Sequence, residues 1–113
     1  MSTSPWIRIE NADFAHFQSD QTRLNAEVFD ALLGLMGEEG DAVAAMPHLS
    51  ALEDAEGLFS TLEALREQGR SLVLVVPEEQ FPLFGEEEWP LVPTFGEALD
   101  YLEMERIQRE LGF

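Results

Sequence analysis

Apolar and polar residues alternate in two short stretches near the start of the chain. Residues 6–10 read WIRIE and residues 14–17 read FAHF, with the triplet NAD between them. Alternation with a period of two is typical of a strand that buries one face, and Asn and Asp favour a turn between two such strands. The pattern therefore predicts an antiparallel hairpin.

Three later segments carry apolar residues at helical spacing. They cover residues 26–37, residues 54–68 and a stretch from Thr94 almost to the C-terminus. The predicted inward residues are Val28, Phe29, Leu32, Leu33, Leu35 and Met36 in the first, Leu58, Phe59, Leu62 and Leu65 in the second, and Phe95, Ala98, Leu99, Leu102, Ile107 and Leu111 in the third. This spacing predicts three amphipathic helices.

Capping residues mark the ends of these helices. Asn25 and Asp54 are expected to cap the first two, and Thr94 with Glu97 forms a T-x-x-E capping box for the third. Glycines follow the first two helices, at positions 37, 40 and 69, and favour a left-handed stop.

Continuous apolar runs separate the helices. Residues 41–46 (DAVAAM) and 71–76 (SLVLVV) have the form of strands covered on both faces, and the first is expected at the sheet centre. Residues 78–85 predict a short helix carrying Phe81, Leu83 and Phe84, and residues 90–93 (PLVP) a short edge strand. Trp89, Phe81 and Phe84 either cover the end of the sheet or form an exposed contact patch.

The resulting order is β-β-α-β-α-β-α-β-α. Alternating helices and buried strands imply a mostly parallel sheet. We therefore expect an α/β fold with a mixed sheet of four to five strands, an N-terminal antiparallel hairpin, central parallel strands and about four helices. The length of 113 residues fits one domain, residues 1–113.

The charge balance of the chain argues against two classes of partner, nucleic acids and membranes. The chain has 23 acidic residues against six basic ones, all of them arginine, which gives a net charge of −17. Such a field repels phosphate backbones and anionic lipid, so we expect neither nucleic acid nor a membrane as a partner. A lysine-free acidic surface is halophile-like, and it equally fits an acidic protein of a GC-rich genome.

The sequence carries no recognisable catalytic constellation. It has no cysteine, no lysine, no G-x-S-x-G, no G-x-G-x-x-G and no P-loop, and His16 and His48 are isolated. We therefore expect no enzyme, no cofactor and no metal. Neither a signal peptide nor a long apolar run is visible, which predicts a cytoplasmic protein.

Several motifs, in this order and spacing, resemble those of the STAS domain, the fold of anti-sigma-factor antagonists. A buried strand and a short loop lead into DAEGL at residues 54–58, where the family shows Asp-Ser-x-Gly-Leu. Gly69-Arg70 precedes the strand at residues 72–76, and VPT at 92–94 is followed by EAL at 97–99. The C-terminal EALDYLEMERIQRELGF is similar to that of small stand-alone bacterial STAS proteins.

The resemblance implies a non-catalytic protein-binding module that acts in regulation and signal transduction. Its partner would be an anti-sigma serine kinase or another STAS protein, bound by residues 47–53 and the first turns of the following helix. The candidate contact residues are Ser50, Asp54, Ala55, Glu56, Gly57 and Ser60. A STAS-type domain that binds a small ligand, and a homodimeric assembly protein that pairs through Trp89, Phe84 and the C-terminal helix, remain alternatives.

One residue departs from the family pattern. The serine that a partner kinase phosphorylates in regulatory STAS proteins is Ala55 here, so the usual phosphorylation is not possible at this position. Glu56 beside it either complements the helix dipole or supplies a permanent negative charge that mimics phosphate in part. Ser50, Ser60 and Thr61 are the alternative hydroxyls.

Overall fold

The computed structural model describes residues 4–10, 14–37 and 40–112. The strands are β1 (Ile7–Ile9), β2 (Ala15–Gln18), β3 (Arg23–Leu24), β4 (Ala42–Ala45), β5 (Ala51–Leu52), β6 (Leu72–Val75) and β7 (Leu91–Val92). The helices are α1 (Ala26–Met36), α2 (Ala55–Glu67), the 3-10 helix η1 (Glu78–Phe84) and α3 (Phe95–Glu110). The predicted hairpin turn at 11–13 lies outside the described residues.

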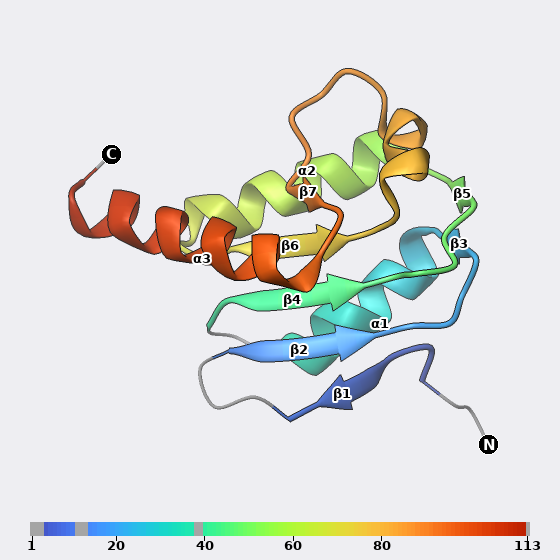
Figure 1. Ribbon diagram of the computed structural model, residues 1–113, viewed down its shortest axis with the longest axis horizontal. Helices are drawn as coiled ribbons and strands as arrows, with labels where there is room; N and C mark the ends of the chain where they lie inside the picture. The colour runs from blue at the N-terminus through green and yellow to red at the C-terminus, as the bar shows by residue number, and fades with distance from the viewer. Residues whose placement is uncertain (1–3, 11–13, 38–39, 113) are drawn as a thin grey trace.

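Five strands form one mixed sheet in the order β1-β2-β4-β6-β7 (Figure 1). β1 pairs with β2 in antiparallel fashion, and β2, β4, β6 and β7 run parallel to one another. β4 is the middle strand, and β7 lies at the edge. These findings confirm the predicted α/β fold class, the N-terminal hairpin, the central place of residues 41–46 and the short edge strand.

Helices cover both faces of this sheet. Residues of α1 and α2 share one apolar cluster with Phe17, Ala42, Ala44, Leu72 and Leu74, which project from the same face. Ala98 and Leu102 of α3 pack on Val43 and Val73, which project from the other face. Figure 1 shows α3 in front of the sheet, with α1 and α2 behind it.

A second, two-stranded sheet was not predicted. β3 pairs in parallel with β5, so the predicted loop at residues 47–53 contains a short strand. β3 and β5 have two residues each, too few to display a hydrophobic period, and neither is an apolar pair bounded by prolines like residues 90–93.

The third helix differs from its predicted apolar stripe. Ala98 and Leu102 are buried, but Leu99, Ile107 and Leu111 are 39%, 44% and 65% exposed. The stripe prediction was therefore wrong at these three positions. Ile107 and Leu111 lie at the C-terminal end of α3, which extends past the end of the sheet (Figure 1). The other two helices also depart from their predicted inward residues, since Leu35 of the first is 43% exposed and Phe59 of the second is only partly buried.

An ion pair holds the far end of α3 to the sheet. Arg109 donates to both carboxylate oxygens of Asp41, at 2.9 and 3.3 Å, and to the carbonyl of Gly69 at 2.7 Å. Asp41 also accepts from the backbone N–H of Ser71 at 2.9 Å. Asp41 therefore ties the entries of β4 and β6 to the last turn of α3.

The aromatic residues around η1 cover the end of the sheet. Phe84 is 3% exposed, and Phe81 and Trp89 are partly buried against the main core. They do not form the exposed patch that the sequence left open.

On the opposite face of the sheet His16 stacks on Phe95 with ring centres 4.5 Å apart, and burial lowers the pKa of His16.

No helix in the described part of the chain combines the length and apolar character that crossing a bilayer requires.

Replacing Leu74 tests the core on the side of the sheet that α1 and α2 cover. Leu74 lies in β6 and is 1% exposed, so Leu74→Ala should lower the free energy of unfolding by about 2–5 kcal/mol. Leu111→Ala removes the same side chain from an exposed position and should change it by less than about 0.5 kcal/mol. Urea unfolding measures both values, and equal losses would contradict this assignment of the core.

Candidate functional site

The candidate contact surface begins where the central strand ends. β4 finishes at Ala45, and residues 47–54 lead from its carboxyl end to the first turn of α2. Loops at the carboxyl ends of parallel strands are the usual place for binding in open α/β sheets. In Figure 1 α2 begins at the end where β4 and β6 finish.

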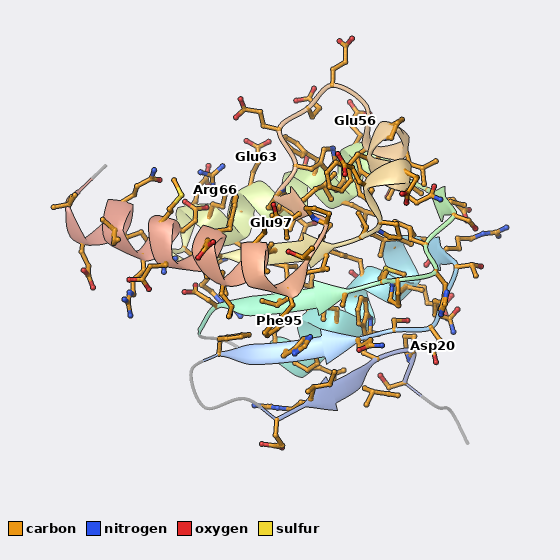
Figure 2. All side chains as sticks on the ribbon, in the orientation of Figure 1. Asp20, Glu56, Glu63, Arg66, Phe95 and Glu97 are labelled. Carbon is orange, nitrogen blue, oxygen red and sulfur yellow. The ribbon has the colours of Figure 1, made fainter. Side chains whose placement is uncertain are left out.

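The candidate contact residues lie on the outside of the molecule. Ser50, Asp54, Glu56, Gly57 and Ser60 are exposed, and Ala55 is partly buried. Leu58, the next residue of the motif, is 3% exposed and anchors the turn in the core. The opening turn of α2 is therefore presented to solvent on a fixed base, as Figure 2 illustrates at Glu56.

Asp54 occupies the N-cap position, but its side chain does not cap the helix. Its backbone is left-handed, with φ 56° and ψ 46°, and its carboxylate accepts no capping hydrogen bond. Asn25 and Thr94 have the ordinary extended conformation, and their side chains accept from the N–H groups of Val28 and Glu97. The prediction of a side-chain cap at Asp54 was therefore wrong, although the helix does begin there.

Gly57 leaves the space that the Asp54 carboxylate occupies. A Cβ atom at position 57 would lie 2.6 Å from Oδ2 of Asp54, closer than real Cβ contacts come. The Asp54 side chain therefore folds over the first turn of α2. It stays at the surface, where its left-handed backbone is a strained feature of the kind that gathers at functional positions.

The loop before α2 is fixed by the small second sheet. The N–H groups of Ser50 and Ala51 donate to the carbonyl of Thr22 at 2.7 and 3.1 Å, and the Ser50 hydroxyl donates to the same atom at 3.2 Å. Arg23 pairs with Glu53 at 2.8 Å. Residues 22–24 therefore form one wall of the site, and sequence reasoning missed them.

The alternative hydroxyls differ in their local contacts. Ser50 is held by Thr22, and the Thr61 hydroxyl donates to the carbonyl of Gly57 at 3.1 Å. Ser60 is exposed on the second turn of α2. Ser50 and Thr61 therefore have the structural role of hydroxyls that bond back to the chain.

The charge at the opening turn is negative. Asp54 and Glu56 stand at a helix N-terminus, where the backbone dipole stabilises carboxylates. Among the described residues neither of them forms an ion pair, whereas Glu53 is paired with Arg23. Within that part of the chain no three His, Asp or Glu side chains gather closely enough to hold a metal ion.

Two cap substitutions test the unusual geometry of Asp54. Asn25→Ala should lower the free energy of unfolding by about 1 kcal/mol, because it removes a capping bond. Asp54→Gly should change it by less than about 0.5 kcal/mol, because relief of the left-handed backbone offsets the lost interaction of the carboxylate with the helix dipole and no capping bond is lost. Thermal or urea unfolding measures the difference, and a comparable loss at both positions would contradict the left-handed assignment.

The comparisons with known proteins add no family to this geometry. No family model, no curated protein and no solved structure matches the chain. The structure establishes an α/β fold with an N-terminal antiparallel hairpin, parallel strands and, in the described residues, four helices counting η1.

Proposed function

We propose that the chain is a non-catalytic regulatory module of the STAS type that binds a protein partner. The partner is an anti-sigma serine kinase or another STAS protein. The contact uses residues 47–53 and the first turns of α2, with Asp54, Glu56 and Gly57 at its centre. The observation that supports this proposal best is the exposed opening of α2 at the left-handed Asp54, which follows the middle strand β4 after the loop that contains β5.

The anchoring of this surface supports binding with little rearrangement. The β3–β5 pair holds the loop from one side, and Leu58 holds the first turn from below. A surface fixed before binding loses little conformational entropy in the complex, which favours affinity. The carboxylates of Asp54 and Glu56 then select a partner that presents positive charge.

Ala55 sets the regulatory behaviour of the module. A methyl side chain cannot accept phosphate, so the partner's kinase activity does not switch this position. Glu56 stands next to it at the positive end of the helix dipole, where it supplies one permanent negative charge. The proposed module therefore stays in one binding state, close to that of a phosphorylated relative.

Affinity capture with a matched pair of variants tests the contact surface. The tagged chain, incubated with lysate of its own host at the host's internal salt concentration, should retain a serine kinase or a STAS protein identifiable by mass spectrometry. Glu56→Lys should reduce the recovered partner at least ~10-fold, since it reverses a charge at the contact.

Glu110→Lys is the control for this capture. It makes the same charge change at an exposed position in the last turn of α3, away from the proposed contact. It should leave recovery within about twofold. Retention of neither class of protein, or equal losses with both variants, would overturn the proposal.

Restoring the family's serine tests the regulatory part separately. With the captured kinase and ATP, Ala55→Ser should accept phosphate at position 55, detected by mass spectrometry of the peptide. The parent chain should remain unmodified there. If the serine variant binds the kinase but gains no phosphate, the phosphorylation argument fails while the contact surface stands.

A further inference from the structure

A hollow of about 570 Å³ lies between the last turns of α2, the middle of α3 and the segment that precedes β7. Its lining residues differ from those of the contact surface proposed above, and the two meet where Trp89 packs on Phe59 of α2. Arg66 on its wall follows Glu56 by ten residues of α2, which corresponds to roughly 15 Å along the helix axis. Figure 2 shows Arg66 and Glu63 along α2, well away from Glu56.

The hollow has aromatic walls that are held in place. Trp89, Phe81 and Tyr101 line it together with Phe84. The Trp89 ring meets Phe84 edge-on at 4.9 Å and Phe59 at 5.3 Å between ring centres. The orientation of the indole is therefore fixed by neighbours on two sides before any ligand arrives.

A largely buried carboxylate completes the hollow. The Glu105 side chain is 13% exposed, and its nearest cation is Nε of Arg66 at 3.5 Å. Burial and the charge of the neighbouring Glu105 carboxylate raise the pKa of Tyr101. A carboxylate accepts about four hydrogen bonds, so Arg66 alone leaves acceptor capacity of Glu105 unused.

The charge on the walls is negative despite Arg66. Glu87 and Glu88 line the hollow in addition to Glu105, so three carboxylates face one guanidinium. An anionic ligand would meet net repulsion there. An uncharged ligand would leave Glu105 without a further counter-charge in a partly desolvated place.

We propose that this hollow binds an organic cation, an ammonium or guanidinium group carried on an aliphatic body. The rings of Trp89, Phe81 and Tyr101 line the hollow and attract the cationic head through their quadrupoles. Glu105 supplies the counter-charge, and Glu87 and Glu88 draw the cation in from solvent. The group is carried either by a free small amine or by a basic side chain of a protein partner, and both present the same chemistry.

The two tryptophans of the chain make this proposal measurable in one spectrum. Trp6 is 4% exposed, and its indole N–H donates to the carbonyl of Val28 at 2.9 Å. The indole N–H of Trp89 has no hydrogen-bond partner in the described residues. In a ¹H–¹⁵N correlation spectrum the Trp89 indole signal reports on the hollow, and the Trp6 signal is an internal reference.

Choline and its uncharged isostere are the probes. At low ionic strength choline should shift the Trp89 indole signal in a saturable way and leave the Trp6 signal in place. The alcohol 3,3-dimethylbutan-1-ol has the same shape without the charge, and it should produce no saturable shift at the same concentrations. Equal responses to both probes, or no response of Trp89 to any cation tested, would overturn the proposal.

Charge-removing variants test the role assigned to Glu105. Glu105→Gln should raise the dissociation constant for choline about 10-fold or more. Glu110→Gln on the same helix should leave this constant within about twofold of the parent value. The double variant E87Q/E88Q changes only the exposed loop and should also weaken binding. An unchanged affinity in both pocket variants would contradict the proposal, and the Trp6 signal verifies that each variant is folded.

A second experiment distinguishes a free amine from a basic side chain of a protein as the source of the cation. Spermidine represents a free amine, and an N-acetylated, C-amidated Gly-Lys-Gly peptide represents a partner's side chain. Tighter binding of the peptide would assign the hollow to a protein contact, and tighter binding of spermidine would assign it to a free metabolite. Failure of choline, spermidine and the peptide alike would remove the site.

Discussion

The burial of β4 on both faces is the constraint on which the rest of the structure depends. Ala42 and Ala44 face α1 and α2 and are 1% and 0% exposed, while Val43 faces α3 and is fully buried. The small side chains on the first face share one apolar cluster with larger residues of α1 and α2. Because the strand lies between β2 and β6, its two ends are fixed in the frame of the whole sheet, and so is the loop that follows it.

The position of α2 follows from this strand. Leu58, Leu62 and Leu65 fix its inner face to the core, so its two ends are held as rigidly as its middle. One end carries the exposed turn with Asp54 and Glu56, and the other carries Arg66 beside the aromatic hollow. The helix therefore places both proposed binding surfaces, one for a partner protein and one for an organic cation, on a single packed element.

The parts of the fold that the sequence predicted are those with a clear hydrophobic pattern, a bounding proline or an ordinary cap. The run at residues 71–76, the Asn25 cap and the Thr94–Glu97 cap belong to this group. Asp54 does not belong to this group. An aspartate side chain suits an N-cap, but here the backbone is left-handed and the carboxylate lies over Gly57. The β3–β5 pair and the hollow near Trp89 arise from contacts between distant segments, for which a single sequence contains no local signal. The exposed stripe of α3 has a similar cause, because periodicity does not reveal where the covering sheet ends.

The distribution of positive charge determines which ligands both proposed binding surfaces favour. Four of the arginines form ion pairs within the chain: Arg23 with Glu53, Arg66 with Glu105, Arg106 with Glu103 and Arg109 with Asp41. Arg8 lies over the ring of Phe17 and Arg70 donates to the carbonyl of Gly37, so the remaining two also have contacts within the fold. With a net charge of −17 and its six bases engaged in this way, the chain has little positive charge to offer a partner. Complementary charge at the opening of α2 and in the aromatic hollow must then come from the molecule that binds, which favours cationic groups over anionic ones at both places.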